Sequence, residues 1–170
     1  MAEIEWCCRQ KAGIKLVEPS SNIALGYISL AENSIGTMNR ERTQNIVFSV
    51  SAGYYAMYYS VYSILAKIGI KCEIHSCTIE MMNYLDFSEE DKKKIKKAFD
   101  MRNILQYYVD KIVDDADINF LINNVPSFVS SSKDILESLN EEDIKQIRNK
   151  INMIISKSRK KKDRGEGDVE

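Results

Sequence analysis

The chain has 170 residues, of which 44% are hydrophobic and 29% are charged, and this balance excludes a chain that is disordered throughout. Lysine and arginine together number 24 and aspartate and glutamate 25, so the net charge is −1 and nucleic-acid binding would need a local basic patch. Two prolines and seven glycines are too few for the turns of an all-β sandwich or barrel, so the composition favours long helices.

The segment up to Pro19 is of mixed composition and predicts irregular structure or a short helix. Residues of the helix-capping type then precede an apolar repeat, which predicts a helix over about residues 22–38. The next helix is expected over residues 43–66, a run of 24 residues without a charge. Such a run suits a membrane span or a helix buried on all sides, and its serines and mid-span tyrosines favour the buried helix. Gly69 is expected to end it.

A loop over residues 70–74 and a short helix over residues 75–85 are expected next. Ser88, followed by three acidic residues, opens a further helix whose apolar stripe reaches Ile112. Asp117 is expected to cap a helix that Pro126 should kink or split near Ile122. Asn140 opens the last helix, which carries isoleucines at spacings of three and four.

These elements predict an all-α fold, an antiparallel helical bundle of five to six helices with an up-and-down four-helix core. We expect the bundle over residues 1–139, a C-terminal helix packed on it over 140–157, and a charged disordered tail over 158–170. Lysines cluster at 92–97 and basic residues at 157–164, and solvated surface is favoured over nucleic-acid contact for both clusters.

The four cysteines, Cys7, Cys8, Cys72 and Cys77, are expected to be reduced. The first residues contain acids and a tryptophan and no secretory signal pattern, so we expect a cytoplasmic protein without disulfides. The spacing Cys-x2-His-x-Cys around His75 is not that of a structural zinc site, and the chain has one histidine in all. No phosphate loop or paired carboxylates are visible, so we predict no metal and no cofactor.

Two side-chain patterns bear on function. Tyr54, Tyr58 and Tyr62 form one stripe of the uncharged helix, and Tyr55 and Tyr59 form another. Core packing with a dimer face is favoured for these stripes over a ligand surface.

Arg102 lies on an apolar stripe, between Ala98 and Leu105, where a guanidinium must be paired, stacked on a ring or turned into a cleft. A pair with a carboxylate of a neighbouring chain, stacking on a tyrosine, and an anion-binding role all remain open.

Three segments, in this order along the chain, resemble the HEPN-domain family: residues 51–60 (SAGYYAMYYS), 67–75 (KIGIKCEIH) and 102–110 (RNILQYYVD). Residues 6–19 resemble an archaeal branch of that family, and the similarity covers about residues 6–136. The resemblance implies a helical bundle that commonly dimerises. It also implies a metal-independent ribonuclease, often the toxin paired with a minimal nucleotidyltransferase. In that chemistry an arginine and a histidine, with four to six residues between them, meet their copies across a dimer cleft.

Arg102 matches the family arginine, whereas the three positions where the histidine would stand are occupied by Tyr107, Tyr108 and Val109. Tyrosine is a poor base at neutral pH because its pKa is near ~10. The tyrosine that the nucleotidyltransferase modifies in the family would fall at Val109 and is absent. The nuclease motif is therefore degenerate.

The expected function is that of a HEPN-like nucleotide- or RNA-associated protein, the HEPN partner of a minimal nucleotidyltransferase in a toxin–antitoxin-type pair. It is expected to form a homodimer, with no membrane contact. The residues expected to bind phosphate or nucleotide are Arg102, Tyr108, Tyr55, Tyr59 and His75. One alternative is a weak metal-independent RNase with Arg102 and Tyr107 as catalytic residues, or with His75 in place of Tyr107. Another is a purely structural dimer.

Overall fold

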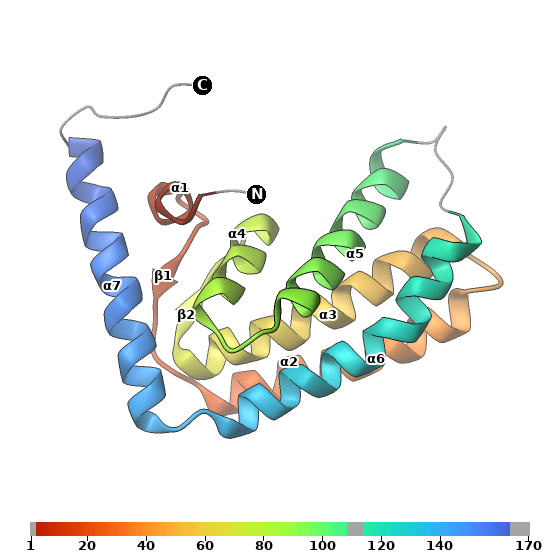
Figure 1. Ribbon diagram of the computed structural model, residues 1–170, viewed down its shortest axis with the longest axis horizontal. Coiled ribbons are helices and arrows are strands. Elements are labelled where there is room, and N and C mark those ends of the chain that lie inside the picture. The colour runs from red at the N-terminus through yellow and green to blue at the C-terminus, as the bar shows by residue number, and fades with distance from the viewer. Residues whose placement is uncertain (1–2, 109–113, 164–170) are drawn as a thin grey trace.

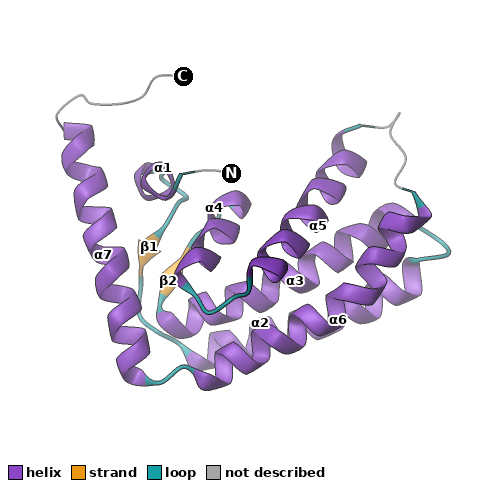
Figure 2. Cartoon of the chain, viewed as in Figure 1, coloured by secondary structure: helices purple, strands orange, loops and turns teal. Residues whose placement is uncertain are grey.

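The computed structural model describes residues 3–108 and 114–163, with the backbone alone for 160–163, and these residues form an all-α fold, as predicted (Figures 1 and 2). The elements in chain order are α1 (Ile4–Arg9), β1 (Lys15–Leu16), α2 (Ser21–Glu41), α3 (Ile46–Ile68), β2 (Ile70–Lys71), α4 (His75–Glu80), the 3₁₀ helix η1 (Met81–Tyr84), α5 (Glu89–Tyr107), α6 (Asp115–Ser138) and α7 (Glu141–Asp163).

Helix α3 is the centre of the bundle. It packs against α2, α5 and α6, which surround it in Figure 1, and most of its side chains are buried. Because α3 is covered on several sides, it needs no charged face, which explains the uncharged run in the sequence. None of the helices in the described part of the chain is long and apolar enough to cross a membrane.

Several predicted helix ends are confirmed. The Ser88 hydroxyl accepts a hydrogen bond from the Asp91 amide at 3.0 Å, and the Asn140 side chain accepts one from the Asp143 amide at 3.0 Å. Gly69 ends α3 in the left-handed conformation, with φ of 79°. The prediction for Asp117 is wrong, because its amide donates to the Asp114 carboxylate at 2.8 Å and α6 begins at Asp115.

Two predicted interruptions are absent from the described helices. Helix α6 continues through Pro126, so of the two predicted outcomes, a kink or a split, the split is wrong; the proline removes one amide donor, the partner of the Ile122 carbonyl. Helix α7 continues to Asp163, so a tail that is disordered from residue 158 is also wrong, and the side chain of Ser158 is fully buried. Residues 164–170 of the predicted tail, and the part of the α5 stripe at 109–113, lie outside the described residues.

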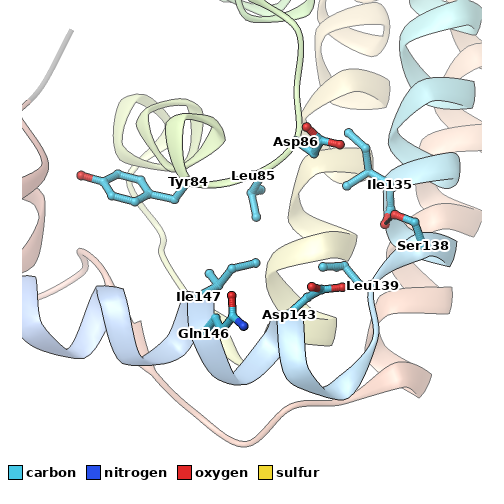
Figure 3. A pocket seen from close by; sticks show the side chains of 9 residues that line it. All are labelled: Tyr84, Leu85, Asp86, Ile135, Ser138, Leu139, Asp143, Gln146 and Ile147. Carbon is cyan, nitrogen blue, oxygen red and sulfur yellow. Dashed lines mark hydrogen bonds between the residues drawn. The ribbon is translucent and has the colours of Figure 1, made fainter.

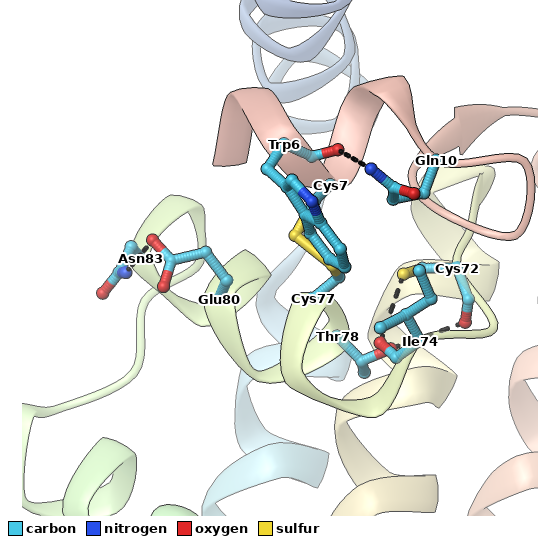
Figure 4. The surroundings of a disulfide bond; sticks show 9 residues. All are labelled: Trp6, Cys7, Gln10, Cys72, Ile74, Cys77, Thr78, Glu80 and Asn83. Atoms are coloured by element: carbon cyan, nitrogen blue, oxygen red, sulfur yellow. Dashed lines mark hydrogen bonds between the residues drawn. A yellow bond between two sulfur atoms is a disulfide. The ribbon is translucent and has the colours of Figure 1, made fainter. Parts of the chain in front are cut away.

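The N-terminal segment lies along residues 70–77. Strands β1 and β2 pair antiparallel, with Leu16 opposite Ile70, so the expected 70–74 loop begins as a short strand. A disulfide joins Cys7 of α1 to Cys77 of α4 across 70 residues of sequence (Figure 4). The prediction of reduced cysteines is therefore wrong for this pair, because only the strand pairing brings the two segments together. Cys8 and Cys72 are free thiols and are buried.

Candidate functional site

His75 is the first residue of α4, and its ring lies among aromatic side chains of α3 and α5. Its Nδ1 atom is hydrogen-bonded to Tyr54 Oη at 2.6 Å. The Tyr58 ring stacks on the imidazole with centroids 4.4 Å apart and an interplanar angle of 14°, and the Phe99 ring lies 6.3 Å away. The Tyr55 ring lies 5.9 Å away, edge-on to the imidazole, so the histidine has four aromatic neighbours.

Burial controls the protonation of this cluster. Burial lowers the pKa of His75, and the positive charge of Arg102 lowers it further. Burial raises the pKa of Tyr54 and of Tyr58 above the ordinary phenol value. The imidazole and both phenols are therefore uncharged at neutral pH. If His75 Nδ1–H donates to Tyr54 Oη, then Nε2 is the basic nitrogen; in the other tautomer Tyr54 donates and Nε2 carries the proton.

Arg102 reaches α3 from α5 and is half-buried. Its Nη2 donates to Tyr55 Oη at 3.4 Å, and its guanidinium carbon lies 5.9 Å from the Tyr55 ring centroid. Its Nη1 donates to the neighbouring Asn103 Oδ1 at 2.9 Å. The Nε atom is buried without a hydrogen-bond partner, and no carboxylate of the described residues forms an ion pair with Arg102. Within one chain, contact with a tyrosine is the alternative that the structure supports.

A row of three half-buried tyrosines leads away from Arg102, and we call Tyr55, Tyr59 and Tyr27 the tyrosine row. The rings of Tyr55 and Tyr59 stack with centroids 5.5 Å apart and an interplanar angle of 25°. The Tyr27 ring of α2 lies 6.0 Å from Tyr59. The structure thus brings Arg102, Tyr55 and Tyr59 together, which are three of the predicted site residues.

The remaining predicted site residues lie at the end of α5. Tyr107 has 71% of its surface exposed, and Tyr108 has 52%. Tyr107 follows Arg102 by five positions, which is a rotation of about 140° around a helix. The two side chains therefore leave α5 in different directions, and one chain does not bring Tyr107 to the guanidinium. Val109, the position of the modified tyrosine in the family, lies outside the described residues.

Sequence reasoning missed Tyr54, Tyr58 and Phe99 as partners of His75. The stripe of Tyr54, Tyr58 and Tyr62 was visible at helical spacing. The spacing could not indicate which tyrosine faces the histidine. The position of α4 against α3 depends on how the chain turns at Gly69 and runs through strand β2.

The lysine cluster at the start of α5 is largely neutralised. Lys92 Nζ lies 2.6 Å from a Glu89 oxygen and Lys94 Nζ 2.7 Å from a Glu90 oxygen. Lys97 Nζ lies 2.7 Å from an oxygen of Asp117 on α6. Three of the five lysines at 92–97 are thus paired with carboxylates.

A separate hollow of about 380 Å³ lies between η1, the end of α6 and the start of α7 (Figure 3). Leu85 and Ile147 point into it, with the carboxylates of Asp86 and Asp143 beside it. It shares no residue with the His75 and Arg102 cluster. No group of three or more histidine, cysteine or acidic side chains in the described part of the chain could hold a metal ion.

Comparison with protein-family models gives no match for this chain, and comparison with curated proteins gives no significant similarity.

Proposed function

We propose that the protein is a HEPN-like nucleotide- or RNA-associated protein that binds a phosphate group at Arg102 and stacks a base on the tyrosine row. In this proposal it is the HEPN partner of a minimal nucleotidyltransferase in a toxin–antitoxin-type pair and acts as a homodimer in the cytoplasm. The resemblance of residues 51–60, 67–75 and 102–110 to that family supports the proposal.

The observation that carries the proposal is the incomplete pairing of the Arg102 guanidinium. A structural arginine in a bundle is expected to be fully hydrogen-bonded, because an unsatisfied buried donor is costly. Arg102 has one long bond to Tyr55, one bond to its neighbour Asn103, and an unpartnered buried Nε. A phosphate oxygen would pair with the Nη donors, since the guanidinium fork suits phosphate geometry, and it would reach the buried Nε only after the side chain shifts.

The aromatic neighbours supply the second part of a nucleotide site. Stacking of a base on an aromatic ring contributes about 1–3 kcal/mol and tolerates any base. Tyr55 and Tyr59 are half-buried and stacked on each other beside the guanidinium. A phosphate at Arg102 would thus place the adjoining base next to the row.

A weak metal-independent RNase is the second candidate, and the position of His75 favours it. The charge of Arg102 is felt at both His75 and Tyr54, so the three groups lie in one electrostatic environment. With its Nδ1–H donating to Tyr54, a neutral His75 would present Nε2 as a general base near a phosphate at Arg102. In this candidate His75, rather than Tyr107, removes the proton from the attacking 2′-hydroxyl.

The test of binding uses a fluorescent single-stranded oligoribonucleotide titrated with wild type, Arg102→Ala and Arg40→Ala. Arg40 is an exposed arginine on α2 and controls for the loss of one positive charge. We expect Arg102→Ala to weaken binding by about tenfold or more, because a charge-assisted bond to phosphate is lost. Equal affinities of the two variants, or no binding by wild type, would reject the binding proposal and leave the structural dimer.

The test of cleavage incubates the same proteins and His75→Asn with mixed RNA in the presence of a chelator. Cleavage by wild type that is lost in Arg102→Ala and His75→Asn supports the RNase candidate, and Tyr107→Phe should then retain activity. Light scattering of the purified protein gives its oligomeric state. A monomer at micromolar concentration would contradict the homodimer.

A further inference from the structure

The two helices joined by the disulfide are too short to be stable alone. Helices α1 and α4 have six residues each, and neither Glu3 nor Ile74 at their N-caps makes a side-chain capping bond. Isolated helices of this length do not persist in water, so both depend on tertiary contacts. Figure 4 shows the Cys7–Cys77 bond running directly from one helix to the other.

The same bond is close in the chain to His75. Cys77 follows His75 by two residues on α4. On the other side of the histidine, the Glu73 amide donates to the Ala12 carbonyl at 2.8 Å. The N-terminal segment therefore holds the chain on both sides of His75. Tyr54 and Tyr58 belong to the long helix α3, so a displacement of α4 changes the contacts of the imidazole and leaves the tyrosines in place.

The two free thiols are poorly suited to exchange with this disulfide. Burial raises the pKa of Cys8 to about 11, and burial also raises the pKa of Cys72. Thiol–disulfide exchange requires a thiolate, so both thiols are slow nucleophiles at neutral pH. The pairing of Cys7 with Cys77 is thereby kept until an external thiolate reaches it.

We propose that the Cys7–Cys77 disulfide is a redox-sensitive device that positions His75, holding it against Tyr54 and Tyr58 when formed and releasing α4 when reduced. The reductant is a dithiol. One of its thiolates attacks a sulfur of the bond, the S–S bond breaks, and a mixed disulfide forms while the other cysteine leaves as a thiolate and takes up a proton. The second thiol of the reductant then displaces the remaining cysteine. The protein gains two electrons and two protons, and the reductant is oxidised to its disulfide.

Both bonded cysteines are fully buried, so reduction follows local opening of one of the two short helices that carry them. The proposal goes beyond nucleotide or RNA binding and does not depend on it. A histidine that responds to reduction in a protein without RNA affinity would reject the proposed function alone.

His75 is the one histidine of the chain, so its Hε1 proton gives a single, assignable NMR signal. The experiment titrates this signal with pH in oxidised protein and in protein reduced with dithiothreitol, with alkylation and mass spectrometry to count free thiols. We expect the pKa of His75 to lie below its ordinary value in the oxidised protein and to move toward that value on reduction, with the helical circular dichroism retained. The variant Cys77→Ser should match reduced wild type and ignore the reductant.

The double variant Cys8→Ser/Cys72→Ser is the matched control, because it keeps the disulfide and should respond to reduction as wild type does. An unchanged histidine signal after proven reduction would overturn the proposal. Loss of the helical signal on reduction would also overturn it, because the bond would then support the whole fold. Failure of Cys7 and Cys77 to pair after mild oxidation would remove its basis. Because wild type is itself measured in both states, a variant that fails to fold does not prevent the test.

Discussion

Arginines in two regions of the molecule contact α3 in opposite ways. At the C-terminal end of α3, Arg148 of α7 donates from Nη1 to the carbonyls of Val17, Ile68 and Gly69 at 2.9, 2.9 and 3.0 Å. On the flank of α3, Arg102 of α5 makes one 3.4 Å bond to Tyr55. Both side chains are half-buried, but the first satisfies carbonyls that a helix end leaves open and the second keeps a buried Nε without a partner.

This difference separates a structural cation from an available one. Arg148 ties α7 to the end of α3 and to Val17, the residue after β1, and these three segments are far apart in sequence. Arg102 joins two neighbouring helices through an aromatic ring, and its donors are not used up. We therefore expect substitutions near Arg148 to change stability and substitutions of Arg102 to change ligand binding.

The largest effect is expected for Gly69→Ala. An alanine there is strained because φ is positive, and its Cβ would collide with the Arg148 guanidinium, the Val17 carbonyl and the Pro19 nitrogen. We expect a loss of roughly 3 kcal/mol in the free energy of unfolding, measured by urea denaturation. Gly36→Ala on α2 is the control, since its Cβ would meet nothing within 4 Å. It should gain about 0.5–1 kcal/mol, and equal losses in both variants would contradict the role of the Gly69 cap.

A loss of about 2 kcal/mol is expected for Arg148→Ala, because carbonyls at the end of α3 lose a charged donor. Lys150→Ala on the same helix serves as the comparison, because Lys150 is exposed and its Nζ lies 5.0 Å from the centroid of the Tyr84 ring. If Arg148→Ala and Lys150→Ala unfolded at the same urea concentration, Arg148 would not have the structural role that distinguishes it from Arg102.

Arg102→Met should change the free energy of unfolding by less than about 1 kcal/mol, because it replaces a poorly paired, half-buried cation with an apolar side chain of similar length. Circular dichroism during urea denaturation measures this directly. A loss as large as that of Arg148→Ala would make Arg102 structural and would count against the binding proposal.

The smallest effect is a pH dependence from His75. Its pKa is lowered in the folded protein, so the unfolded chain takes up the proton more readily. The stability that neutral His75 contributes is present above the unfolded value near ~6.5 and is lost as the pH falls below it. Urea denaturation at about pH 5 and about pH 7 should show this loss in wild type and less of it in His75→Asn. The pKa values of three carboxylates are also lowered, and these groups take up protons at a lower pH than His75 does: Glu73, Glu89 and Glu90.

Local chemistry made much of the bundle predictable. A capping side chain and its amide partner are three residues apart, so Ser88 and Asn140 could be recognised without knowing the fold. Gly69 was recognised because a left-handed helix end favours glycine. The start of α6 was placed three residues late, because Asp114, Asp115 and Asp117 could all serve as the cap.

The site was predictable in its parts and not in its arrangement. Arg102 was conspicuous because a cation interrupts an apolar stripe, and the tyrosines because they recur at helical spacing. The hydrogen bond between His75 and Tyr54, and the disulfide between Cys7 and Cys77, depend on how residues 70–77 fold back along the N-terminal segment.

The sequence alone determined the all-α class, the buried central helix and most helix ends, because these follow from hydrophobic periodicity and from contacts within one turn of the chain. Only the tertiary structure decided that Arg102 contacts Tyr55 and that His75 lies between Tyr54, Tyr58 and Phe99. Such contacts depend on the rotation and offset of one helix against another, which are set by the packing of the whole core.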